Sequence, residues 1–360
     1  MVILPFPMAF KQPNIRDLPN PAAVHAAVKD MRSRYSERVC MAPTNDCEGS
    51  IIAAHTLSVG KMLTPISRDG HVYALKPDCY AANFNEVLSI GLCGVRKTST
   101  FNGFCAKHDR ELFLPIENKP FTASTEQFFL HAYRAICKEC YGKPRQAQQA
   151  DRIPEIRQNI HNQASATVTS DELLYMAASK VGATDVHLLK MKMDKLLIGK
   201  DFSKLRTTFI KFKKMPSIVC NFVYMPDMDF DDRELQDFTA PPGSMELLFV
   251  TVSPNEDGGG YLLLSHLGNR KATNPCRRLI DSLLAQSDIS SAVATLIITR
   301  CENFAISPDW FGSLNSYQQR TIQEACYVGL PPIPGVTPIP TLQKIKIQVQ
   351  DWVPEKPTYR

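Results

Sequence analysis

The segment Asn102-Gly-Phe-Cys105-Ala-Lys-His108-Asp109 places a cysteine and a histidine three residues apart. Thiolate and imidazole groups are ligands that zinc prefers, and four such groups complete a structural zinc site. The Cys-x2-His spacing directs both side chains toward one ion, as in a zinc knuckle. Upstream, Cys40 and Cys47 provide a second pair across a short turn. The sequence therefore predicts a zinc site, which we call the Cys3His cluster: Cys40, Cys47, Cys105, His108.

A short apolar strand lies between the two pairs of ligands. Asn45, Asp46 and Gly49 are typical turn residues, and Ser50-Ile-Ile-Ala-Ala-His55 follows them as an apolar run. The run ends in a histidine, and the second ligand pair comes after a longer stretch that contains the turn signal Asp69-Gly70. The chain order is therefore ligand pair, strand ending in histidine, insertion, ligand pair.

This order resembles the HNH nucleases, whose core is a treble-clef or ββα-metal finger. In many members a cysteine pair precedes a short strand that ends in a motif like Ala-Ala-His. An asparagine later precedes Cys-x2-Cys, which is followed directly by His or Asn. Ile51-Ile-Ala-Ala-His55 matches the first part, and the segment from Asn102 to Asp109 matches the second. The resemblance covers residues 38–115 approximately.

The resemblance implies a role for each matching residue. His55 would be the general base that activates water, and Asn102 would orient its imidazole. Asp109 would take the position of the final His or Asn, as a ligand to a catalytic magnesium or manganese ion, for which a carboxylate is a suitable ligand. The implied activity is metal-dependent cleavage of nucleic-acid phosphodiesters, with DNA favoured over RNA, and such bacterial proteins often act in defence against phage.

A second hypothesis from another class stays open, in which the finger is not catalytic. His55 and Asn102 are 47 residues apart, His108 replaces the usual second cysteine, and Ala54 stands where many members carry a metal-binding residue. A zinc finger that lacks catalysis would scaffold a surface for a partner or bind nucleic acid. Whether the chain is an HNH-type endonuclease or an interaction protein is therefore not decided by these residues.

Charged side chains suggest two kinds of partner. Residues 190–214 carry nine Lys/Arg against two acids, and residues 227–257 carry nine acids against one Arg. These segments are solvated faces, a track for a phosphate backbone, or surfaces through which residues 190–257 bind a protein partner or a second copy. Five basic residues near the finger are candidates for contacts with nucleic-acid phosphates: Lys61, Arg96, Lys97, Lys107, Arg110.

Composition excludes several other classes. The 360 residues are 44% hydrophobic and 21% charged, as in folded proteins. A nucleic-acid partner cannot be argued from the net charge of +5 and has to be argued from local patches. Eleven cysteines without an export signal argue against a disulfide framework and favour a cytoplasmic location. No apolar run reaches the length of a membrane helix. No phosphate-binding glycine loop occurs, so nucleotide-dependent chemistry is unsupported.

The chain as a whole is expected to have an α+β fold. A zinc-stabilised HNH-like module with flanking helices (1–145) would precede a helical connector (146–204). A β-rich α+β domain (205–330) would follow, then a Pro-rich linker at 331–340 and a C-terminal strand near 341–352. Within these units the helices are expected at residues 21–35, 124–141, 171–183 and 185–202, with Ser170 capping the third. Strands are expected at 207–213, 218–224, 245–252, 261–266 and 294–299.

Overall fold

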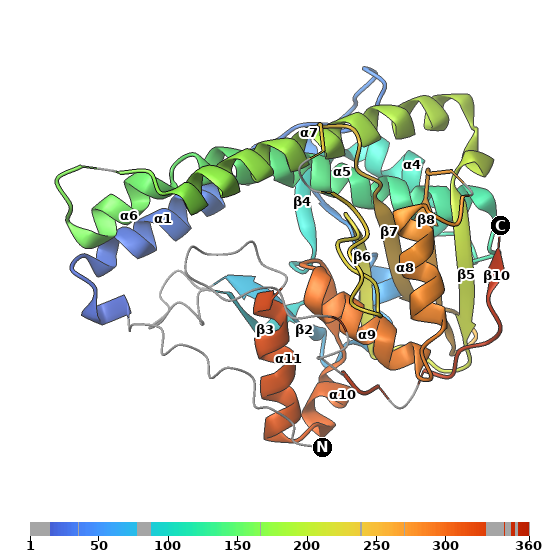
Figure 1. Cartoon of the computed structure of the whole chain (residues 1–360). Helices are drawn as coiled ribbons and strands as arrows, with labels where there is room; N and C mark the ends of the chain where they lie inside the picture. Colours follow the sequence, from blue (N-terminus) through green and yellow to red (C-terminus); the bar gives the residue numbers. More distant parts are fainter. Residues whose placement is uncertain are drawn as a thin grey trace.

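The protein is described by a computed structural model, which places helices on both faces of one large antiparallel sheet. It describes residues 15–34, 36–77, 88–165, 167–237, 240–269, 271–328, 342, 347–349 and 352–359. The mixed helix and strand content agrees with the expected α+β class (Figure 1). Cys79 and the expected linker at 331–340 lie outside the described residues.

The large sheet has eight strands in the order β10-β5-β8-β7-β6-β9-β2-β3, and all its pairings are antiparallel. Strands β7 and β8 are buried along their whole length, which requires cover on both faces. The strands of this sheet are β2 (His71–Pro77), β3 (Leu88–Gly94), β5 (Arg206–Phe212), β6 (Ile218–Tyr224), β7 (Leu248–Pro254), β8 (Gly260–His266), β9 (Phe304–Ile306) and β10 (Thr358–Tyr359).

Alternate side chains of the central strands enter two separate cores. On β7, Val250 packs with α8 (Pro275–Leu284) and α9 (Ile289–Arg300), whereas its neighbour Phe249 packs with α5 (Thr125–Ala150). Figure 1 shows α8 and α9 in front of the sheet. Burial of both faces accounts for the uninterrupted apolar character of these strands.

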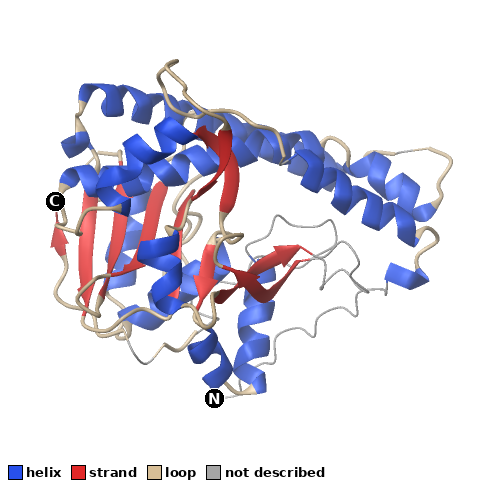
Figure 2. Ribbon diagram, turned by 180° about the vertical axis from the view of Figure 1, so that it is seen from behind, coloured by secondary structure: helices blue, strands red, loops and turns tan. Residues whose placement is uncertain are grey.

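The helices form a layer behind the sheet and an arm beside it. The long helix α7 (Ser170–Gly199) packs along α5, and α1 (Pro21–Arg34) packs on α6 (Ile153–His161). Figure 2 shows α1, α6 and the first part of α7 extending away from the sheet. The remaining short elements are η1 (Ile15–Asp17), η2 (Val59–Leu63), α2 (Thr64–Ile66), η3 (Phe202–Lys204), α10 (Pro308–Ser313) and α11 (Ser316–Val328).

A second, two-stranded sheet precedes the helix that carries His108 of the Cys3His cluster. β1 (Ile51–His55) pairs antiparallel with β4 (Thr100–Cys105), and α4 (Ala106–Glu117) begins directly after β4. The insertion between β1 and β4 contains the β2–β3 hairpin, which joins the large sheet where β2 pairs with β9. The large sheet therefore contains strands from both sides of the expected boundary at residue 145, which itself falls inside α5.

Two expectations about single elements were wrong. The apolar run 294–299 belongs to the helix α9, in which every residue from 290 to 299 is buried, so no alternation distinguishes a strand from a helix. Residues 171–183 and 185–202 form one helix, α7, instead of two. The strand expected near 341–352 falls mostly outside the described residues; those described there (342, 347–349 and 352) are in no strand, and further along the chain β10 pairs with β5.

Candidate metal centre

A ββα unit brings the candidate ligands together. In this unit β1 and β4 pair antiparallel, and the helix α4 starts at the residue after Cys105. Cys105 is the N-cap of α4, where its Sγ accepts a hydrogen bond from the backbone N–H of His108. The first helical turn thereby brings the side chains of Cys105 and His108 to one side, as the Cys-x2-His spacing predicts.

The four ligand atoms of the Cys3His cluster lie within 4.8 Å of one another. The Nδ1 atom of His108 is 3.3 Å from the Sγ of Cys40, 3.7 Å from that of Cys47 and 3.2 Å from that of Cys105. Three sulfurs and one imidazole nitrogen at such separations can hold one tetrahedral metal ion. The cluster predicted from the sequence is confirmed as a group that could bind a metal.

The orientation of His108 also suits a metal ligand. Its Nε2 lies 3.1 Å from Oδ1 of Asp46 and 3.0 Å from Oγ1 of Thr44, so the proton sits on Nε2 and the Nδ1 lone pair faces the thiols. Metal-ligating histidines commonly donate their second N–H to a carboxylate in this way, which fixes the tautomer and the ring. The donor set therefore fits zinc.

Acidic and basic side chains surround the cluster. Lys107 Nζ lies 2.9 Å from Oδ2 of Asp46 and 3.0 Å from Oε1 of Glu48. Hydrogen bonds from Thr44 and Lys107 hold the pKa of Asp46 well below its usual value, so this carboxylate stays ionised beside His108. Burial would raise the pKa of the Cys105 thiol, but backbone N–H donors lower it to about 7, which favours the thiolate needed for metal binding.

The candidate base His55 lies at the end of β1, opposite Thr100 of β4. Its Nε2 donates to the carbonyl oxygen of Arg96 at 3.2 Å, which leaves Nδ1 as the proton acceptor. Burial lowers the pKa of His55, while the Arg96 carbonyl and the Asp109 carboxylate act in the opposite direction. The imidazole is therefore neutral at neutral pH and can accept a proton.

Asp109 lies in the first turn of α4. Its carboxylate interacts electrostatically with the imidazole of His55. Its Oδ1 is buried and has no hydrogen-bond partner among the described residues. Burial raises the pKa of Asp109, and the nearby Arg134 acts against that rise. A buried carboxylate oxygen without a partner is an uncommon feature that calls for water or an ion.

The third expected catalytic residue is placed differently. The side-chain amide of Asn102 donates to the carbonyl oxygen of Ser36 at 3.3 Å, and His55 donates to the carbonyl oxygen of Arg96 in the turn before β4. In the part of the chain that the structure describes, no hydrogen bond joins Asn102 to His55. The backbone carbonyl of Arg96 occupies the orienting position that the resemblance implied for Asn102.

The sequence analysis did not single out three polar residues that contact one another near the segments of His55 and Asp109. Arg134 of α5 forms a buried ion pair with Glu117, the last residue of α4, and Ser58 donates to the other oxygen of Glu117 at 2.5 Å. One signal was present in the sequence: Arg134 interrupts an otherwise apolar helix face next to Tyr133. A charged residue at a core position usually has a partner or a function.

The five candidate phosphate contacts fall into two groups. Lys61 pairs with Glu256, and Arg110 pairs with Glu111 at 3.3 Å. Lys107 pairs with Asp46 and Glu48. Arg96 and Lys97 are exposed in the turn that contacts His55, and the described residues contain no acidic partner for either. The structure thus places two exposed cations beside the candidate base and three cations in local ion pairs.

The charged segments expected to bind a protein partner are partly paired within the chain. Lys211 lies 2.8 Å from Asp257, which joins the basic segment to the acidic one across the β5–β8 pair. Arg300 pairs with Asp227 at 3.0 Å, and Lys190 is buried against Asp194. Part of each charge excess is therefore already compensated inside the molecule.

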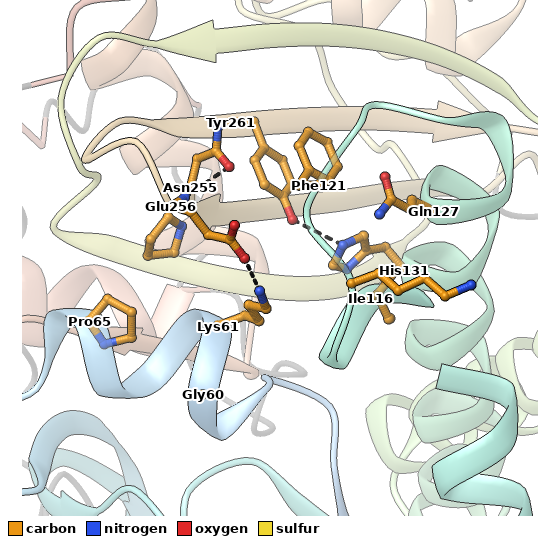
Figure 3. A pocket seen from close by; sticks show the side chains of 12 residues that line it. Gly60, Lys61, Pro65, Ile116, Phe121, Gln127, His131, Asn255, Glu256 and Tyr261 are labelled. Carbon is orange, nitrogen blue, oxygen red and sulfur yellow. Dashed lines mark hydrogen bonds and ion pairs between the residues drawn. The ribbon is translucent and has the colours of Figure 1, made fainter. Parts of the chain in front are cut away.

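A small cavity lies between the ββα unit and the large sheet. Figure 3 shows the ion pair of Lys61 and Glu256 on one side of it and the stacked rings of Phe121 and Tyr261 on the other. The hydroxyl of Tyr261 is 3.1 Å from Nε2 of the buried His131. The cavity volume is about 90 Å³, roughly three water molecules by volume.

Comparisons with models of protein families, with curated proteins and with solved structures found no match to this chain. The resemblance to HNH nucleases therefore depends on the residues quoted above and on the ββα unit in which they lie. Among the described residues, none of the helices combines the length and the apolar character that a bilayer crossing requires.

Proposed function

We propose that the protein is a metal-dependent nuclease of HNH type, with a structural zinc in the Cys3His cluster. One observation carries the proposal. The proposal is supported by the origin of two residues in one ββα unit, His55 at the end of β1 and Asp109 in the first turn of α4, and by the effect of the Asp109 carboxylate on the pKa of His55. The histidine comes from the end of the first strand and the carboxylate from the first helical turn, as the resemblance implies.

The residues of the chain would divide the reaction as follows. His55 Nδ1 would accept a proton from the attacking water, because Nε2 is engaged with the Arg96 carbonyl. Asp109, whose Oδ1 lacks a partner among the described residues, would hold a magnesium or manganese ion. Such an ion, when bound, polarises the scissile phosphate and stabilises the leaving oxygen. Arg96 and Lys97 would contact flanking phosphates.

One observation favours the second candidate, a zinc finger without catalysis. The side chain of Ala54 is 1% exposed and lies in the core beside Phe101, where many HNH proteins carry a metal ligand. A site with one fewer protein ligand holds a divalent ion more weakly. The scaffold hypothesis therefore predicts zinc without cleavage.

The test is elemental analysis of protein purified without added metal, beside cleavage of plasmid and single-stranded DNA with magnesium or manganese. We expect one zinc per chain and metal-dependent cleavage, and His55→Ala should abolish cleavage while zinc content and melting temperature stay unchanged. His71→Ala is the matched control, since His71 also bonds a backbone carbonyl, at 2.8 Å, but lies at the surface. Cleavage by His55→Ala at the wild-type rate would refute the catalytic assignment. Zinc without any cleavage would support the scaffold.

A further inference from the structure

Arg134 is a cation in the interior of the protein. It lies on α5, is 2% exposed, and donates through Nη1 to Oε1 of Glu117. Its guanidinium carbon lies 4.0 Å from the centre of the Phe113 ring. A buried ion pair is weak evidence for stability, because desolvation of two charges offsets most of their attraction. Stability alone therefore does not explain why Arg134 and Glu117 are paired in the interior.

The partner of Arg134 joins the two segments that carry the candidate catalytic groups. Glu117 closes the helix that begins next to Asp109, and its second oxygen accepts from the hydroxyl of Ser58. Ser58 lies three residues after His55 and caps the turn η2. The chain of contacts Arg134–Glu117–Ser58, which we call the Arg134 clamp, thus fixes the segment after His55 and the helix of Asp109 against α5.

Unpaired polar atoms lie on the same three segments. Arg134 Nε, Asp109 Oδ1 and Thr56 Oγ1 are buried and have no hydrogen-bond partner among the described residues. They come from α5, from α4 and from the residue after His55. Buried polar atoms are almost always paired with protein groups or water. Each of these three atoms therefore has room for a hydrogen bond to water or to a ligand oxygen, and all three belong to segments that the contacts of Arg134 and Glu117 hold together or that adjoin them.

We propose that Arg134 is a positioning residue of the candidate active site, which it serves by holding His55 and Asp109 in register through the Arg134 clamp. The kinetic test of this inference rests on the proposed nuclease function, whereas the NMR titration of His55 does not. Arg134 itself needs no contact with substrate for this role. It acts through Glu117 and Ser58.

The charges around His55 supply an independent readout. The groups that act on its imidazole are Asp109 and Glu117 from α4, Arg134 from α5, and the Arg96 carbonyl. Arg134 is the cation of this set and lowers the pKa of His55, whereas both carboxylates raise it. Removal of Arg134 leaves two acids beside the imidazole, so the pKa of His55 should rise.

The experiment compares Arg134→Gln with Arg145→Gln. Arg145 is a close match: it lies on the same helix, is buried, pairs with Glu37 and stacks 3.9 Å from the Tyr141 ring. We would measure zinc content, melting temperature, kcat and KM on DNA, and the titration of His55 by NMR of 15N-histidine protein. We expect Arg134→Gln to lower kcat about a hundredfold with KM within about twofold, and to raise the pKa of His55. Arg145→Gln should change only the melting temperature.

Two further variants keep the test decisive. Arg134→Lys retains the charge, so it should restore the His55 titration and part of kcat. If Arg134→Gln fails to fold, the double variant Arg134→Met with Glu117→Gln removes both buried charges, and kcat should still be low. Wild-type kcat in that variant would overturn the inference.

The failure of the inference can be told apart from failure of the nuclease proposal. If the wild-type protein cleaves no DNA, the nuclease proposal fails, and the NMR titration alone tests the clamp. A His55 pKa that rises in Arg134→Gln and not in Arg145→Gln supports it. Equal His55 titrations in the two variants overturn it.

Discussion

At the scale of single residues, the two nitrogens of His108 have different tasks. Nδ1 faces the three thiols, and Nε2 donates its proton toward Asp46 and Thr44. The ligands could be predicted because cysteine and histidine at short spacing carry their chemistry in the sequence. Asp46 could not, because an aspartate in a turn is usually only a turn residue. Its role depends on a contact between positions 62 residues apart.

Asp46→Ala should therefore weaken zinc binding without removing a ligand. We expect the zinc dissociation constant to rise about 10- to 100-fold, since the imidazole loses the group that orients it. Competition with a chelating dye measures this change. Glu48→Ala is the control, because Glu48 contacts Lys107 and not His108. Equal zinc affinities in the two variants would refute the role of Asp46.

The basic residues near the finger should differ in their effect on DNA binding. The double variant Arg96→Ala, Lys97→Ala should bind DNA more weakly and lower the slope of log K against log salt by about two, roughly one for each lost phosphate contact. Lys61→Ala should leave the slope unchanged, because Lys61 is paired with Glu256. Fluorescence anisotropy at several salt concentrations gives the slopes. The same slope in both variants would contradict this division.

At the scale of elements, local sequence signals located some strands well and were less reliable for the length or the type of a helix. The strands β5, β6 and β8 lie within a residue of their expected bounds, because turn residues flank each apolar run. α7 was expected as two helices, but it packs along α5 and continues through Gly182 and Thr184, two weak helix formers. The run 294–299 was expected as a strand, and its apolar and β-branched residues do not distinguish a buried strand from the buried helix α9.

The N-cap of α7 also differs from the expected residue, and the difference can be tested. Thr169, not Ser170, is the N-cap: its Oγ1 accepts from Glu172 N at 3.2 Å, and the Glu172 carboxylate accepts from Thr169 N at 2.8 Å. Thr169→Ala should lower the free energy of unfolding by about 1 kcal/mol. Ser170→Ala should change it by less than about 0.5 kcal/mol. Urea titrations and hydrogen exchange of the first turn would show the difference, and the reverse order would refute the cap.

At the scale of the whole molecule, burial fixes the protonation of two histidines. Burial lowers the pKa of His131 to about 3 and that of His266 to about 4. Both are neutral in the folded protein near pH 5, while the unfolded chain, with an ordinary pKa near 6.5, binds a proton at each. The unfolded state therefore gains protons as pH falls, and the folded state loses stability.

This linkage predicts a steep acid dependence of stability. Between about pH 6 and pH 4 each histidine should contribute a loss of about 1.4 kcal/mol per pH unit. The double variant His131→Gln, His266→Gln should show a slope shallower than the wild type by about 2.7 kcal/mol per pH unit in urea titrations. His71→Gln, at the surface, should leave the slope unchanged. Equal slopes for the double variant and the wild type would refute the linkage.

The hairpin β2–β3 has a consequence for anyone who tries to divide the molecule. A fragment of residues 1–145 would retain β2 without the strand that covers its outer edge, since β9 would be missing. The complementary fragment would expose β9 in turn. Bare strand edges recruit other chains, so both halves should aggregate when expressed alone and recover solubility when produced together. We therefore expect the ββα unit and the large sheet to fold together.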